Sequence, residues 1–225
     1  MVEDYKWKGC PAVIGIGKNY LEHAKETGME VPPEYPLIFF KNPSAITTNG
    51  APIVIPPICK FNGPQVDYEG ELAVIIGRTC KDVPEDKALE VVGAYAIAND
   101  VSARWWQRKG SGGQFNRGKS FDSFCPVSEP VVASKIPDPQ ALRIVTKLNG
   151  ETMQDCGTSE MIFSVKRIIA ELSAGTTLQE GTIILTGTPS GVGDARKPPV
   201  YLKHGDVVEI TIEGLGVLKN NVVEE

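Results

Sequence analysis

Residues 72–76 constrain the fold most, because a strand that is apolar on both faces must be covered on both sides. Residues 91–98 form a second long apolar run. Acidic side chains border both runs: Glu69 and Glu71 lie at the start of the first, and Asp100 follows the second. Side chains alternate along a strand, so Glu69 and Glu71 are expected to point to the same face. Carboxylates at the edge of a core are costly unless they are paired, protonated or bound to a metal.

Convergence of these carboxylates predicts a site for a hard divalent cation. Ligation by oxygen alone suits Mg²⁺, Mn²⁺ or Ca²⁺ better than zinc or copper. Carboxylates at Glu69, Glu71 and Asp100 would leave one dication with a net charge near −1, so water or a chelating substrate would fill the open positions. The alternative is that Glu69 and Glu71 lie on the exposed face of an edge strand and bind no ion.

Short apolar segments separated by glycine and proline recur along the chain, as in a strand-rich domain. The expected strands comprise residues 11–16, 37–40, 52–57, 66–76, 91–98, 142–148, 182–186, 207–212 and 216–223. The expected helices comprise residues 19–28, 101–109 and 164–173. Prolines indicate that residues 52–57 form an edge strand, and Asn149-Gly150 predicts a hairpin turn. We expect one α+β domain over residues 1–225, with residues 1–11 as a short N-terminal extension.

The expected helix at residues 19–28 carries a histidine and an acid on one face. Asn19 is predicted to cap it, with Glu22 in the capping-box position. His23 and Glu26 are three residues apart, so their side chains can hydrogen-bond to each other. The carboxylate would then orient the imidazole, which is the usual arrangement for a general base. The alternative is a polar helix surface without a catalytic role, since the helix is rich in charge.

Further polar side chains follow the expected metal ligands. Arg104 and Gln107 are three residues apart on the helix expected after Asp100, where they could hold a carboxylate or a carbonyl oxygen. Lys119 follows a glycine-rich loop and could be either a pocket cation or a surface lysine. A second glycine-rich loop, which includes Thr188, could grip an anionic oxygen. It is not a phosphate-binding P-loop, because it lacks the G-K-[ST] sequence.

Composition excludes several classes of function. The chain has 225 residues, of which 41% are hydrophobic and 23% charged, as in ordinary soluble proteins. Its net charge is −5 and it has no basic stripe, so no nucleic-acid partner is expected. No apolar run reaches the roughly 18 residues of a membrane span, and no secretory signal or transit peptide is visible. The five scattered cysteines indicate free thiols in a reducing compartment.

Five motifs occur together in one order along the chain. They are YLEHAKE (20–26), DYEGELA (67–73), NDVSAR (99–104), GKSFD (118–122) and LTGTPSGVG (185–193). With these motifs the chain resembles the fumarylacetoacetate hydrolase family over residues 12–223, and it is similar to the short, single-domain members. The resemblance implies the family's catalytic-domain fold, a mixed β-roll or β-sandwich with a few short helices, and a homodimer.

The resemblance also implies roles for individual residues. Mg²⁺ or Mn²⁺ would be held by Glu69, Glu71 and Asp100. His23 and Glu26 would form a catalytic dyad on a mobile helix that closes over the substrate. Arg104, Gln107 and Lys119 would also have catalytic roles. The substrate would be bound by Lys41, Arg104, Gln107 and Thr188.

Within the family, the chain is most similar to a branch described as oxaloacetate tautomerases. We therefore expect an enzyme that converts oxaloacetate-like 2-oxo acids through a metal-stabilised enolate. Hydrolysis of acylpyruvates, which are 2,4-dioxo acids, and decarboxylation of oxaloacetate stay open as alternatives. A more distant alternative is a calcium-binding module without catalysis. The expected location is the mitochondrial matrix or the cytoplasm.

Overall fold

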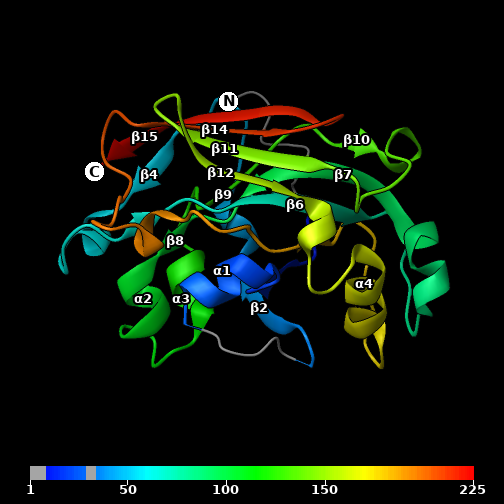
Figure 1. The fold of residues 1–225 in the computed structure, drawn as a ribbon. Helices are drawn as coiled ribbons and strands as arrows, with labels where there is room; N and C mark the ends of the chain where they lie inside the picture. Colours follow the sequence, from blue (N-terminus) through cyan, green and yellow to red (C-terminus); the bar gives the residue numbers. More distant parts are fainter. Residues whose placement is uncertain (1–8, 29–33) are drawn as a thin grey trace.

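The computed structural model describes residues 9–28 and 34–225, so most of the expected N-terminal extension lies outside the described residues. Two β-sheets are stacked face to face, and the labelled helices gather in the lower half of the view (Figure 1). This arrangement confirms the expected α+β fold. No helix in the described ranges has the length and apolarity needed to cross a membrane.

The larger sheet has eight strands in the order β2-β1-β13-β6-β7-β9-β3, and β10 pairs with β7. These strands are β1 (Val13–Gly17), β2 (Leu37–Lys41), β3 (Ile46–Thr48), β6 (Gly70–Ile76), β7 (Val92–Asn99), β9 (Cys125–Val127), β10 (Val131–Val132) and β13 (Ile183–Leu185). The two long apolar runs become the central antiparallel pair, β6 and β7, with Leu72 opposite Ile97. Both side chains are fully buried, as the sequence predicted, and each burial stabilises the fold by about 1.5–3 kcal/mol.

The smaller sheet has the order β12-β11-β14-β15-β4. Its strands are β4 (Ile53–Ile55), β11 (Arg143–Leu148), β12 (Glu151–Gly157), β14 (Val207–Ile212) and β15 (Gly216–Glu224). The expected edge strand is confirmed in β4. The expected hairpin is confirmed between β11 and β12, where Asn149 and Gly150 have φ of 52° and 86°.

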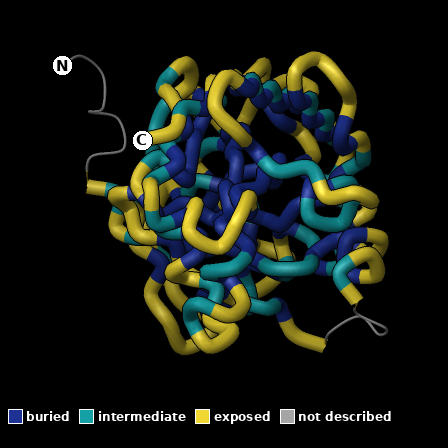
Figure 2. The backbone as a smooth tube through the Cα atoms, turned by 90° about the vertical axis from the view of Figure 1, so that its left-hand side faces the viewer, coloured by how far each residue is buried: buried dark blue, intermediate teal, exposed yellow. Residues whose placement is uncertain are grey.

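The main apolar cluster includes residues of both sheets, and the buried part of the backbone gathers in the interior of the molecule (Figure 2). Leu72 from β6 belongs to the same apolar cluster as Ile144 and Ile210 of the smaller sheet. The sheets approach closely at Gly70, where a Cβ atom would lie 2.2 Å from Oγ1 of Thr146. A glycine between the two glutamates therefore allows β6 to meet the smaller sheet.

Helices and a small third sheet complete the described fold. The helices are α1 (Leu21–Glu26), α2 (Arg104–Arg108), α3 (Phe115–Lys119) and α4 (Val165–Ser173), and the two-stranded sheet pairs β5 (Val66–Asp67) with β8 (Ser102–Ala103). The expected helix at residues 164–173 is confirmed in α4, where the Ser164 side chain accepts a hydrogen bond from the Arg167 N–H. The expected helix at 101–109 begins only at Arg104, because the preceding residues pair as β8.

The predicted Asn19 cap was wrong. Helix α1 begins after Tyr20, and no side chain in the described part of the chain caps it. The Asn19 amide instead donates to the carbonyls of Phe163 at 3.0 Å and Thr186 at 2.7 Å. Asn19 is fully buried, so its polar atoms need partners inside the protein, and these come from distant segments.

Candidate active site

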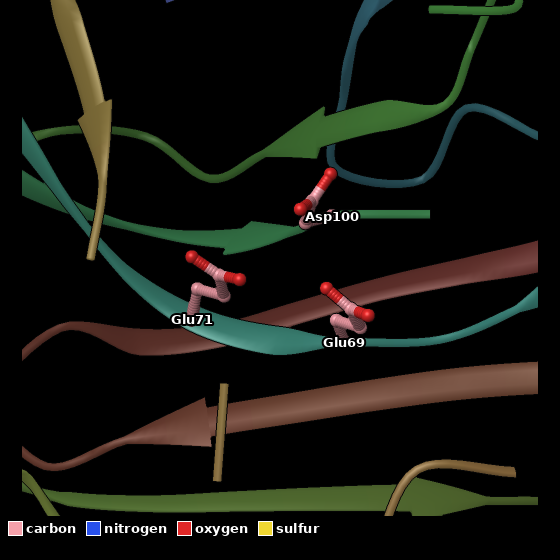
Figure 3. A group of neighbouring side chains, drawn as sticks. All are labelled: Glu69, Glu71 and Asp100. Carbon is pink, nitrogen blue, oxygen red and sulfur yellow. The ribbon is translucent and has the colours of Figure 1, made fainter. Parts of the chain in front are cut away.

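The three predicted metal ligands converge. One ligand atom from each of Glu69, Glu71 and Asp100 lies within 4.8 Å of the other two, and all three residues are buried. Figure 3 shows them on β6, on the segment before it, and just after the end of β7. Pairing of Gly70 with Asn99 brings these segments together, and the Asp100 N–H donates to the Glu69 carbonyl at 2.9 Å. Glu69 lies between β5 and β6, so the expected continuous strand at 66–76 is interrupted.

Buried cations contact two of these carboxylates. Lys119 Nζ donates to Glu69 Oε2 at 2.9 Å, to Ser102 Oγ at 2.8 Å and to Asp100. Arg104 Nη1 donates to Glu69 Oε1 at 2.7 Å. Burial acts to raise the pKa of Glu69, but Lys119, Arg104 and His23 outweigh it and hold that pKa well below its ordinary value. Glu69 is therefore ionised.

The negative charge of Glu71 is compensated less than that of Glu69. It accepts a hydrogen bond from the Gly187 N–H at 2.7 Å. Burial, together with the nearby Asp100 and Glu69 carboxylates, raises the pKa of Glu71 well above its ordinary value. When Asp67 is included, which also pairs with Arg104, four buried carboxylates face the three buried cations Lys41, Arg104 and Lys119. An all-carboxylate donor set with unbalanced negative charge fits a hard dication such as Mg²⁺ or Mn²⁺.

A cavity of about 220 Å³ opens onto this cluster. Seven of the residues predicted from the sequence line it, namely His23, Glu69, Glu71, Arg104, Gln107, Lys119 and Thr188. Phe39 and Phe115 give it an apolar wall. The cavity therefore combines acidic, cationic and apolar surfaces, which suits a small polar anion bound together with a cation.

His23 and Glu26 form the predicted pair. His23 Nδ1 lies 2.7 Å from Glu26 Oε1, and the Gly191 N–H donates to both Glu26 oxygens, at 3.2 and 3.1 Å. His23 is 6% exposed and lines the cavity, so its side chain can reach a bound ligand. With Nδ1 held by the carboxylate, Nε2 is the nitrogen left for proton transfer.

The chain matches a known protein family and one of its named members. Residues 12–223 match the family described as fumarylacetoacetate (FAA) hydrolase C-terminal. The chain belongs to the fumarylacetoacetate hydrolase family. The human protein named oxaloacetate tautomerase FAHD2A, mitochondrial, is 43% identical over 212 residues, which are 94% of this chain and 66% of that protein.

Two similar solved structures are enzymes of the same fold. A 5-carboxymethyl-2-hydroxymuconate delta-isomerase from Mycobacterium smegmatis has a TM-score of 0.82 and 43% identity, over 95% of this chain and 79% of that one. A fumarylpyruvate hydrolase from Pseudomonas aeruginosa, in complex with Mn²⁺ and pyruvate, has a TM-score of 0.85 and 30% identity, over 95% and 90%. The chain is thus an enzyme of a family that includes isomerases and hydrolases.

Two residues that were predicted to bind the substrate, Lys41 and Thr188, bond to other protein groups in the structure. Lys41 does not line the cavity; its buried Nζ donates to Asp100 Oδ1 at 2.5 Å and to the Val101 carbonyl at 3.2 Å. Lys41 therefore pairs with a predicted metal ligand rather than lining the cavity. Thr188 lines the cavity, yet its hydroxyl donates to the Gly70 carbonyl at 2.9 Å and accepts from Gln154 Nε2 at 2.8 Å.

Sequence reasoning missed several residues of this family site. Asp67 is fully buried and accepts from Arg104, although it lies within the recognised DYEGELA segment. Its position two residues before Glu69 is a sequence signal that could have indicated a role in the site. Lys18 and Arg108 also line the cavity. Their sequence contexts, a strand end and a short helix, carry no pattern that separates them from surface cations.

Proposed function

We propose that this protein is a divalent-cation-dependent enzyme that interconverts the keto and enol forms of oxaloacetate. The observation that carries the proposal is the convergence of Glu69, Glu71 and Asp100 beside a cavity that Glu69, Glu71 and His23 line, with Glu26 bonded to His23. The 43% identity to the human oxaloacetate tautomerase supports the choice of reaction and substrate.

Glu69, Glu71 and Asp100 would hold the cation at the buried end of the cavity. A cation bound there would supply a Lewis acid for the carbonyl group of a 2-oxo acid. Gln107 lines the same cavity, and its side-chain oxygen accepts from Arg104 Nη1 at 3.0 Å, so its NH₂ group can donate to a ligand oxygen. Gln107 would thereby help to orient the substrate by its 2-oxo acid end.

His23 would move the proton. In the keto-to-enol direction, carbon 3 would lose a proton to His23 Nε2 and the carbonyl oxygen would take one from water. His23 would then return its proton to the solvent, so no proton is gained or lost overall. Glu26 would hold the imidazole in the tautomer that leaves Nε2 free to accept. Gly191 in turn would keep the Glu26 carboxylate in place through its N–H.

A second candidate function is hydrolysis of acylpyruvates, with decarboxylation of oxaloacetate as a related reaction. The 2.7 Å contact between His23 and Glu26 favours it, because such a pair can also activate a water molecule. The fold shared with a fumarylpyruvate hydrolase supports it further.

One substrate panel separates these reactions. The enzyme would be assayed with Mg²⁺, with Mn²⁺ and with EDTA on oxaloacetate, acetylpyruvate and longer acylpyruvates. We expect rapid loss of enol-oxaloacetate absorbance without CO₂ release, and only with a cation present. Cleavage of an acylpyruvate at a far higher kcat/KM would favour the hydrolase. Full activity in EDTA would contradict the cation requirement.

Assembly and location are further proposals. We infer a homodimer in the mitochondrial matrix or the cytoplasm; the human relative carries the word mitochondrial in its name. Sedimentation velocity would test the dimer against the 24.3 kDa mass of one chain.

A further inference from the structure

Four cationic side chains line the cavity: Lys18, Arg104, Arg108 and Lys119. Two of these side chains already donate hydrogen bonds to carboxylates inside the protein. Lys119 has three N–H donors, and its contacts with Glu69, Asp100 and Ser102 use all of them.

The Arg104 guanidinium also donates to carboxylates inside the protein. Its Nε and Nη2 donate to Asp67 Oδ2, and its Nη1 donates to Glu69 and Gln107. Because breaking a buried pair leaves an uncompensated charge, this guanidinium is a poor candidate for a second ligand anion.

Arg108 also has a partner. Its Nη2 donates to Asp194 Oδ2 at 2.5 Å and its Nη1 to Oδ1 at 3.4 Å. Asp194 accepts from Tyr201 as well, and its backbone N–H donates to Asp67. Turning Arg108 toward a ligand would therefore break one end of an established network.

Lys18 is different. Within residues 9–28 and 34–225, no hydrogen bond or ion pair engages its ammonium group, although the residue lines the cavity. Its φ is 56°, in the left-handed region that favours glycine, so a lysine there is strained. It lies between the end of β1 and Asn19, which the Phe163 and Thr186 carbonyls hold in place. A strained residue with an unpaired cation, held beside a cavity, is typical of a ligand contact.

We propose that Lys18 binds the second carboxylate of the substrate, so that the enzyme selects dicarboxylic 2-oxo acids over monocarboxylic ones. The inference rests on the proposed function, in which the 2-oxo acid end faces Glu69 and Glu71. A second carboxylate would meet repulsion from these acids unless a cation faced it. Among the described residues, Lys18 is the cavity cation whose ammonium group has no bonded partner, so its donors can supply that contact.

Binding of two non-reacting anions tests the assignment. Oxalate consists of two directly joined carboxylates and mimics only the chelating end, whereas 3,3-difluorooxaloacetate also carries the distal carboxylate and has no hydrogen on carbon 3. Both would be titrated calorimetrically with Mn²⁺ present into the wild type, Lys18→Met, Lys18→Arg and Lys18→Gly. Lys25→Met is the matched control, because Lys25 lies on α1, is exposed, pairs with Glu22 and does not line the cavity.

We expect Lys18→Met to weaken difluorooxaloacetate binding roughly 10- to 100-fold, the range for a hydrogen bond to a charged group, and to leave oxalate binding unchanged. Lys18→Arg should retain most of the affinity, and Lys25→Met all of it. Lys18→Gly relieves the positive φ, so it should fold at least as well as the wild type and still lose the preference.

Equal effects of Lys18→Met and Lys18→Gly on both anions, or no effect on either, would overturn the role of Lys18 while leaving the proposed function intact. If the wild type bound neither anion with Mn²⁺ and turned over no 2-oxo acid, the proposed function would fail, and the Lys18 assignment with it.

Discussion

Arg104 donates to one oxygen of Asp67 through two nitrogens, with Nε at 2.9 Å and Nη2 at 2.6 Å from Oδ2. The same guanidinium reaches Glu69 through Nη1. Asp67 also accepts from the backbone N–H groups of Gly193 and Asp194. Asp67 therefore connects the loop after β13 to a predicted metal ligand, with Arg104 as the intermediate.

Asp67→Asn should destabilise the protein and reduce its activity. The change leaves the buried Arg104 without a full counter-charge, which costs about 3–5 kcal/mol. Urea unfolding would measure the stability, and kcat/KM with oxaloacetate the activity. Asp155→Asn is the matched control, because Asp155 pairs with Arg143 at the surface and should cost less than about 1 kcal/mol. Equal costs for the two variants would contradict the role given to Asp67.

His23→Ala should lower the rate of the enzyme by about 10²- to 10⁴-fold, the usual contribution of a general base, and leave Mn²⁺ affinity unchanged. His23 is not among the carboxylate ligands, so cation binding does not require it. Steady-state kinetics and Mn²⁺ titration would measure the two effects. His204→Ala is the control, because His204 is the chain's other histidine and does not line the cavity; this change should have no effect. A wild-type rate for His23→Ala on every substrate would show that His23 is not the base.

Stabilisation by a divalent cation should increase with pH. The pKa of Glu71 lies well above its ordinary value of 4.5 in the folded, cation-free chain, so that chain holds a proton that the unfolded chain releases. Above pH 4.5 the stability of the cation-free protein therefore falls as pH rises toward the folded pKa. A bound cation replaces this proton, so its stabilising effect grows over the same interval.

Thermal unfolding with Mg²⁺ and with EDTA, followed across this pH range, would measure the difference in Tm. Calorimetry in buffers of different ionisation enthalpy would detect the released proton. Glu71→Gln should flatten the pH dependence in EDTA, because the titrating group is gone. A difference in Tm that is constant with pH would argue against a protonated Glu71.

Gly70→Ala should destabilise the protein by about 1–3 kcal/mol through overpacking, since its Cβ would lie 2.2 Å from Thr146 Oγ1. Thr146→Ala should recover much of this loss in the double variant. That hydroxyl has no hydrogen-bond partner among the described residues, so its removal alone should cost little. Urea unfolding of the two single variants and the double variant gives the coupling energy. Additive effects would mean that the close approach of the sheets is not the cause.

The sequence by itself determined the features that depend on local pattern. Two long apolar runs predicted the central strands β6 and β7, and Asn149-Gly150 predicted the hairpin of the smaller sheet. Acids at the ends of apolar runs also predicted the carboxylate cluster, because a charge next to a buried strand needs a nearby partner or ion. The family resemblance added the remaining roles.

Only the tertiary structure decided which partner each buried polar group takes. Lys41 and Asp100 are 59 positions apart in sequence, and Asp67 and Arg104 are 37 apart. Asn19 bonds to Phe163 across 144 positions instead of capping its own helix. Buried polar atoms must be satisfied by whatever the packed sheets bring near them, and a local sequence window contains no information about those distant neighbours. For the same reason, only the tertiary structure shows that the ammonium group of Lys18 has no bonded partner among residues 9–28 and 34–225, whereas the other cavity cations have theirs.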